Sequence, residues 1–170
     1  MIKYLPNTVS VVFEEIPDMV TLMIEITQCQ NNCEGCHSPW LKQDIGEELT
    51  EDKLREIIEK NKGVNCLLFS GEGKDPLTLV KLAKIGKECG LKTGVYSGRE
   101  TIPYEEALMY TDAFDYIKIG PYVKKWGPLN NECTNQHLYY KNLGLETVLF
   151  DGQPFIGWTD ITYKFWKRKI

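Results

Sequence analysis

Short apolar segments that alternate with amphipathic segments constrain the fold of this 170-residue chain more than any other feature. Residues 64–69 are almost wholly apolar, as in a strand that is covered on both faces. Asp75 and Pro76 follow as the N-cap and first residue of a helix, and Gly90 is placed to end it. Alternating strands and helices build a mostly parallel sheet, so the sequence predicts an α/β fold in a single domain over residues 1–170.

The rest of the chain continues this alternation. A second helix is expected after Thr50, which is a suitable N-cap, and a shorter one lies near residues 103–110. Further strands are predicted, from their Val, Ile and other apolar residues, at 9–13, 21–26, 92–96, 114–119 and 146–150.

Four loops that follow predicted strands carry unusual residues. Because ligands bind at the carboxyl ends of parallel strands, we expect these loops to converge on one active-site rim. The loops are residues 29–37, 70–73, 97–98 and 120–121.

Composition excludes several classes of protein. With 42% hydrophobic and 26% charged residues the chain is of the soluble globular type. Twenty Lys and Arg residues stand against 24 Asp and Glu, a net charge of −4, which argues against a nucleic-acid-binding surface. No apolar run approaches the roughly 18 residues of a membrane span, and the first residues lack the apolar stretch of a secretory signal. We therefore expect a cytosolic protein that binds neither membrane nor nucleic acid.

The six cysteines carry the strongest chemical signal. Thiols stay reduced in the cytosol, so clustered cysteines there indicate metal binding or catalysis. Cys29, Cys33 and Cys36 fall within eight residues, and with only two histidines a histidine-rich metal site is excluded. Cys66 lies in an apolar strand and is expected in the core, whereas Cys89 and Cys133 receive no role.

The segment between these cysteines is predicted to be a loop. On a helix, Cys29 and Cys36 would be about 10 Å apart along the axis, too far for three thiolates to close on one centre. Asn31, Asn32 and Gly35 are turn-forming residues, which favour a loop that wraps three sulfurs around one centre.

Several centres are compatible with such a loop. Zinc would take Cys29, Cys33, Cys36 and His37, but the adjacent Cys36 and His37 would have difficulty binding one ion from opposite directions. Cys33 to His37 also matches the C-x-x-C-H attachment site of c-type haem, which needs export and leaves Cys29 unused. Three unrelated core cysteines would not be expected among polar neighbours. An iron–sulfur cluster suits three soft thiolates best, and a four-iron cubane with three protein ligands leaves one iron open.

The C-x-x-x-C-x-x-C spacing after a first strand resembles the signature of the radical S-adenosylmethionine enzymes. Residues 29–40, with Gly-Cys-His at the third cysteine, resemble the activating proteins of anaerobic ribonucleoside-triphosphate reductase. The similarity continues through residues 94–99, 115–122, 134–136 and 160–166, and so covers most of the chain.

This resemblance implies an incomplete (β/α) barrel with its site at the strand carboxyl ends. It implies that Cys29, Cys33 and Cys36 hold a [4Fe–4S] cluster whose fourth iron binds S-adenosyl-L-methionine. Reduced flavodoxin or a similar donor would supply an electron that cleaves the sulfonium. The 5′-deoxyadenosyl radical would then take a hydrogen atom from a glycine of the reductase, leaving a glycyl radical.

The resemblance also implies which residues contact the cofactor. Ser70, Gly71 and Glu72 occupy the place of a Gly-Gly-Glu or Gly-Gly-Asp loop that touches the methionine amine, although the order here is Gly-Glu-Gly and a plain turn is the alternative. Gly35 stands where many superfamily members have an aromatic residue, and His37 could contact the nucleoside or be a simple loop histidine. The expected contact set is Gly35, Cys36, His37, Ser70, Gly71 and Glu72.

Two further features have open interpretations. Ser97 and Lys118 are predicted at strand ends that face the same rim; Lys118 could neutralise a carboxylate of the cofactor or lay its stem on apolar surface. Residues 163–170 combine aromatics with four positive charges, and could dock an acidic donor or the reductase, or pack on the body.

Two other functions remain possible on the sequence. One is a radical enzyme that acts on a small molecule, of the deazapurine synthase type, against which the lack of a recognisable substrate domain counts. The other is a non-catalytic iron–sulfur or zinc module that only binds a partner. Formation of 5′-deoxyadenosine separates an enzyme from a binding module.

Overall fold

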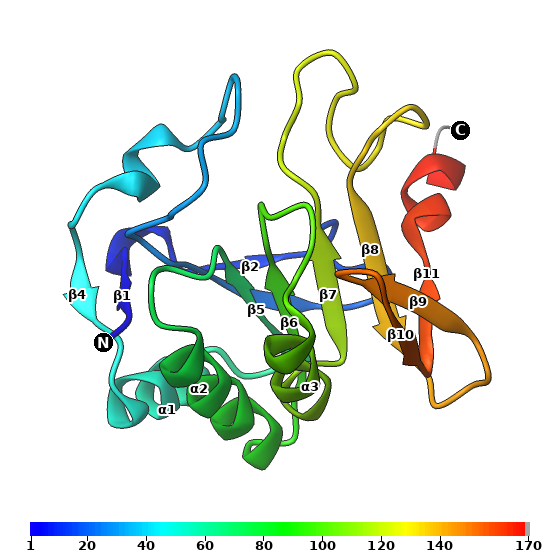
Figure 1. Cartoon of the computed structure of the whole chain (residues 1–170). Helices are drawn as coiled ribbons and strands as arrows, with labels where there is room; N and C mark the ends of the chain where they lie inside the picture. Colours follow the sequence, from blue (N-terminus) through cyan, green and yellow to red (C-terminus); the bar gives the residue numbers. More distant parts are fainter. Residues whose placement is uncertain (169–170) are drawn as a thin grey trace.

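The computed structural model describes residues 1–168 and is built around one seven-stranded sheet (Figure 1). Its strands are β2 (Ser10–Val12), β3 (Thr21–Glu25), β5 (Cys66–Ser70), β6 (Lys92–Tyr96), β7 (Tyr116–Ile119), β8 (His137–Lys141) and β11 (Trp158–Asp160), in the spatial order β11-β8-β7-β6-β5-β3-β2. The four strands β3, β5, β6 and β7 are parallel, and β2, β8 and β11 extend the sheet antiparallel at its two sides. The result is a mixed sheet; the incomplete barrel remains a prediction of the resemblance.

Three helices connect the parallel strands: α1 (Glu51–Lys60), α2 (Pro76–Glu88) and α3 (Tyr104–Ala113). Figure 1 shows them together on one side of the sheet. The predicted caps are confirmed, since the Thr50 side chain accepts a hydrogen bond from the Lys53 amide at 3.2 Å and Asp75 accepts one from the Thr78 amide at 3.1 Å. Within residues 1–168, every helix is too short or too polar to cross a bilayer.

Shorter elements complete the chain. They are β1 (Lys3–Tyr4), β4 (Glu47–Glu48), β9 (Thr147–Phe150), β10 (Gln153–Ile156) and the 3-10 helices η1 (Pro6–Thr8), η2 (Pro39–Lys42) and η3 (Thr162–Arg168). β1 pairs with β4 and β9 pairs with β10, each as a separate two-stranded sheet. The strand predicted at 146–150 therefore exists, but it belongs to a hairpin outside the main sheet.

Side chains alternate between two apolar layers across the sheet. In β5, Leu67 and Phe69 are fully buried against the helices, and Cys66 and Leu68 are fully buried on the other face. This explains why residues 64–69 read as a continuous apolar run.

The face away from the helices is covered by what we call the roof, namely residues 13–19, residues 121–135 and η3. Each segment contributes a side chain to the second apolar layer: Ile16 from residues 13–19, Leu129 from residues 121–135 and Phe165 from η3. In Figure 1 the yellow loop before β8 and the red η3 lie at the end of the sheet opposite the helices. The sheet thus has the three α-helices on one face and the two loop segments and η3 on the other, and the cavity described below lies on that second face.

Candidate active site

One row of side chains crosses the four parallel strands near their carboxyl ends. In the register of the sheet, Glu25 is opposite Ser70, Ser70 is opposite Tyr96 and Tyr96 is opposite Lys118. Neighbours in one register position point to the same face of a sheet. All four line a cavity of about 650 Å³ under the roof. The sheet therefore offers a carboxylate, a hydroxyl, a phenol and an ammonium in one line.

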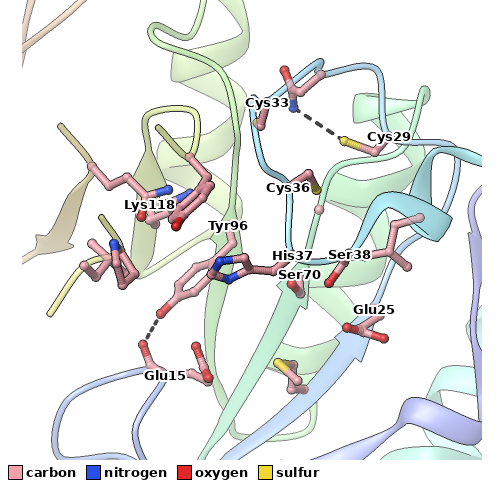
Figure 2. Close-up of a pocket in the computed structure, with 18 of the residues that line it drawn as sticks. Glu15, Glu25, Cys29, Cys33, Cys36, His37, Ser38, Ser70, Tyr96 and Lys118 are labelled. Atoms are coloured by element: carbon pink, nitrogen blue, oxygen red, sulfur yellow. Dashed lines mark hydrogen bonds between the residues drawn. The ribbon is translucent and has the colours of Figure 1, made fainter. Parts of the chain in front are cut away.

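The cysteine loop borders one end of this cavity. Cys29, Cys33 and Cys36 are free thiols, are half-buried and line the cavity together (Figure 2). The Cys29 amide donates to the Leu41 carbonyl at 2.9 Å, which closes the neck of the loop, and the Cys36 amide donates to the Cys33 carbonyl at 3.3 Å. The Asn31 side-chain amide donates to the Cys29 sulfur at 3.7 Å. The loop predicted from its turn-forming residues is confirmed.

Soft thiolates are the ligands that an iron–sulfur cluster prefers. Within the described part of the chain, no three His, Cys, Asp or Glu side chains are grouped around one possible ion position. The imidazole of His37 instead lies against the ring of Tyr122, with ring centroids 4.4 Å apart. A four-iron cluster with one open iron would take three thiolate ligands. Three soft, unpaired thiols at one end of a cavity fit that donor set.

Gly35 has a structural place in this loop and does not line the cavity. Its φ of +69° is in the left-handed region, and an added Cβ would meet the Cβ of Lys124 at 3.7 Å. Glycine thus allows the turn that returns the chain to Cys36.

Gly71 borders the cavity beside Ser70. Its φ is +98°, its amide donates to the Tyr96 carbonyl at 3.0 Å, and an added Cβ would lie 3.1 Å from the Ile26 carbonyl oxygen. The position therefore requires glycine.

Glu72 is buried outside the cavity lining. Its carboxylate accepts hydrogen bonds from the Ser97 hydroxyl at 2.5 Å, the Arg99 guanidinium at 2.6 and 3.2 Å, and the Tyr110 hydroxyl at 2.7 Å. Burial raises the pKa of Tyr110, and the Glu72 charge raises it further. Burial acts to lower the pKa of Arg99, but the bonds to Glu72 raise it overall.

Lys118 places a buried cation at the cavity. It is 8% exposed, and its ammonium donates to the carbonyls of Ser97 at 3.3 Å and Gly120 at 3.0 Å. No carboxylate among residues 1–168 forms an ion pair with it. Burial lowers the pKa of Lys118 to about 8, which the charges of Cys33 and Glu72 partly oppose. Such an ammonium can bind an anionic group of a ligand in the cavity.

Carboxylates border the other end of the cavity. Figure 2 shows Glu15 and Glu25 away from the cysteine loop, with Glu15 beside the Tyr96 hydroxyl. Glu14 also lines this end, and the Tyr96 hydroxyl donates to the backbone carbonyl of Glu15. Burial raises the pKa of Glu15. The sequence analysis missed these residues, although Glu25, near the end of the predicted strand at 21–26, could have been found from strand periodicity.

The aromatic C-terminal segment packs on the body where the structure describes it. Phe165 lines the cavity, the Trp166 indole donates to the Leu129 carbonyl at 3.1 Å, and Lys164 pairs with Asp18 at 2.8 Å. Lys169 and Ile170, the end of the predicted basic tail, lie outside the described residues.

The remaining cysteines lie away from the cavity. Cys66 is fully buried, as predicted, and burial raises the pKa of its thiol to about 12. Cys89 and Cys133 are exposed.

Six of the eight predicted site residues thus meet at one cavity, namely Cys29, Cys33, Cys36, His37, Ser70 and Gly71. Gly35 and Glu72 do not line it. Ser97 lies one residue beyond the row and anchors both Glu72 and Lys118. Comparison with models of protein families, with curated proteins and with solved structures finds no match for this chain.

Proposed function

We propose that this protein activates anaerobic ribonucleoside-triphosphate reductase by generating a glycyl radical on it, using a [4Fe–4S] cluster and S-adenosyl-L-methionine. The observation that carries the proposal is the grouping of three free, C-x-x-x-C-x-x-C-spaced thiols with Ser70 and Gly71 at one cavity on the carboxyl side of a parallel sheet. The sequence resemblance of residues 29–40 supplies the reaction and the partner.

When bound, these groups supply one-electron cleavage of the sulfonium and an adenosyl radical that removes a glycine Cα hydrogen from the reductase. The thiolates of Cys29, Cys33 and Cys36 would each hold one iron. The hydrogen bond from the Cys29 amide to the Leu41 carbonyl keeps the loop beside the cavity that its three thiols line, where a bound cluster would be within reach of a ligand.

The wall of the cavity suits the polar end of an amino-acid-containing cofactor. Lys118 would bind a carboxylate, because its buried ammonium has hydrogen bonds to carbonyls but no anionic partner among the described residues. Ser70 and Gly71, which line the cavity, would lie beside the amino-acid end of the ligand. The volume of about 650 Å³ lies within the usual range for small-molecule sites and suits a nucleoside joined to an amino acid.

The roof would limit access of water during the reaction. Leu129 and Phe165 line the cavity from above, and the Trp166 bond to Leu129 joins two roof segments. A radical that meets no water or loose side chain is consumed only by its intended target. Reduced flavodoxin or a similar protein would supply the electron, and the cytoplasm is the compartment in which reduced thiols and this donor occur together.

The test starts with purification without oxygen, reconstitution with iron and sulfide, reduction, and electron paramagnetic resonance with and without S-adenosylmethionine. We expect a reduced four-iron signal that changes when S-adenosylmethionine is added. Addition of the reductase and S-adenosylmethionine should then give a glycyl radical signal and one 5′-deoxyadenosine per radical formed. A triple Cys29→Ala, Cys33→Ala, Cys36→Ala variant is the matched control.

Three results have distinct meanings. A cluster that does not respond to S-adenosylmethionine, or a preparation that holds only zinc, would contradict the enzymatic function and leave a binding module. Release of 5′-deoxyadenosine without a radical on the reductase would contradict the proposed partner and favour a small-molecule substrate.

A further inference from the structure

The loops that follow β5 and β6 are joined to the neighbouring strands along the cavity rim. The Gly71 amide donates to the Tyr96 carbonyl at 3.0 Å, and the Ser97 amide donates to the Lys118 carbonyl at 2.8 Å. These bonds continue the ladder of the sheet by one step. Beyond them the chain is in loops, where one further backbone bond, from the Gly120 amide to the Arg99 carbonyl at 2.7 Å, is joined by bonds from side chains.

The Glu72 carboxylate is the centre of this side-chain fixation. It is 7% exposed and accepts four hydrogen bonds, two of them from Arg99. An ionised carboxylate has about four acceptor positions, so its capacity is filled by the protein. A ligand ammonium could bind this carboxylate only if the hydrogen bond from Arg99, Ser97 or Tyr110 broke. Breaking the buried ion pair with Arg99 is costly.

The donors come from two different elements. Ser97 and Arg99 belong to the loop after β6, and Tyr110 belongs to α3. Glu72 itself belongs to the loop after β5, between two cavity-bordering residues and α2. One carboxylate therefore joins two rim loops to a helix on the opposite side of the sheet.

The same network reaches the cavity through Ser97. The Ser97 hydroxyl donates to Glu72, while its carbonyl accepts from the ammonium of Lys118. The course of the loop at Ser97 thus sets where the Lys118 ammonium rests. On the other side, Glu72 directly follows Gly71, whose backbone borders the cavity.

We propose that Glu72 is a positioning residue and does not contact the cofactor. It holds the backbone of Ser70 and Gly71, and through Ser97 the ammonium of Lys118, in the arrangement that receives the amino-acid end of the ligand. The identity of that ligand rests on the proposed function. The resemblance places an acid that binds the amine at this position; in this chain we infer that the acid supports the loops instead.

The first test measures backbone mobility and needs no S-adenosyl-L-methionine. Amide hydrogen exchange of the reconstituted protein is compared for wild type, Glu72→Gln and Tyr110→Phe, which removes one bond and keeps the charge. The matched control is Glu106→Gln, since Glu106 also pairs with Arg99, at 2.8 Å, but accepts no other hydrogen bond of this network. We expect faster exchange at residues 71–73 and 97–99 in the first two variants and not in the control. Unchanged exchange in Glu72→Gln would overturn the proposal.

The second test separates a positioning residue from one that contacts the ligand. Calorimetry measures the affinity for S-adenosylhomocysteine and for the same compound without its amino group. If Glu72 is a positioning residue, Glu72→Gln should weaken the affinity for both compounds by the same factor, at least about tenfold. Arg99→Gln should have the same effect. A penalty that disappears with the compound lacking the amine would show a direct contact and overturn the proposal. Failure of the wild type to bind either compound would contradict the proposed function, and hydrogen exchange would still decide the role of Glu72.

Discussion

The imidazole of His37 packs on the phenol ring of Tyr122, with ring centroids 4.4 Å apart and planes inclined by 49°. His37 ends the cysteine loop and Tyr122 starts the long loop between β7 and β8, so this contact joins two segments that are distant in the sequence. Gly35 lies close to Lys124 in the same way. The cysteine loop is therefore supported from the roof as well as from its own neck.

This support predicts how firmly iron is retained. Tyr122→Ala removes the ring that His37 packs against, and should speed the loss of iron from the reconstituted protein to a chelator severalfold. Tyr122→Phe keeps the ring and should lose iron at the wild-type rate. The measurement is the decay of the cluster absorbance after addition of the chelator. Equal rates in all three proteins would show that the neck bonds alone hold the loop.

Reactivity of the six thiols should divide into three groups. Cys89 and Cys133 are exposed and should react with iodoacetamide in the native protein, whereas Cys66 is buried with a pKa of about 12 and should not. Cys29, Cys33 and Cys36 should react in the protein without iron and be protected after reconstitution. Peptide mass spectrometry without oxygen reads all six sites. Protection of two of the three, or of Cys89 or Cys133 instead, would contradict the assigned ligands.

Lys118 is expected to lower the stability of the folded protein and to strengthen ligand binding. The drop in its pKa from 10.5 to about 8 corresponds to a cost of about 3 kcal/mol for burying the ammonium. Lys118→Met removes this cost but also removes two hydrogen bonds. Without the cofactor, the variant should therefore be more stable than wild type at pH 7 by about 1–2 kcal/mol. Its affinity for S-adenosylhomocysteine should nevertheless fall at least about tenfold.

The pH dependence follows from the sign of the shift. Between pH 8 and 10.5 the unfolded chain holds a proton on Lys118 that the folded chain has released, so this residue makes wild-type stability rise with pH. The advantage of Lys118→Met should therefore shrink over that interval in urea unfolding at pH 7, 8.5 and 10. An advantage that stays constant would mean that the Lys118 ammonium is not desolvated.

Gly71 predicts a local steric effect. Gly71→Ala places a Cβ 3.1 Å from the Ile26 carbonyl oxygen at a φ of +98°, and should cost about 1–3 kcal/mol of unfolding free energy and weaken binding at the cavity. Gly90→Ala is the control, because Gly90 has a φ of +81° but open space around the added Cβ. It should lose stability through the backbone alone and bind S-adenosylhomocysteine as wild type does. Similar binding losses in both variants would contradict a specific role of the Gly71 backbone.

The parts of the fold that were predictable depend on local chemistry. Thr50 and Asp75 cap their helices as expected because a cap involves residues three apart in the chain. The apolar run at 64–69 gave β5 because burial on both faces leaves no polar positions. By contrast, β8 contains His, Tyr and Lys, and exists through its pairing with β7 and β11, which no local pattern reveals.

The site residues that could be predicted are likewise those marked by a local sequence pattern. The thiols of Cys29, Cys33 and Cys36 were found by their spacing, and Ser70 and Gly71 by their place after a strand. Glu72 was assigned to the cofactor because the resemblance places a Gly-Gly-Glu or Gly-Gly-Asp loop there. Its real partners, Arg99 in the loop after β6 and Tyr110 in α3, are 27 and 38 residues away in the sequence.

The roof lets the lining of the cavity change independently of the helix-side core. Within residues 1–168, its three segments contribute Ile16, Leu129 and Phe165 to the smaller apolar layer and no residue to the larger layer beside the helices. Exchanges in residues 121–135 that keep Tyr122 and Leu129 would therefore alter the lining of the cavity and leave the helix-side core unchanged, as with binding loops on a rigid scaffold.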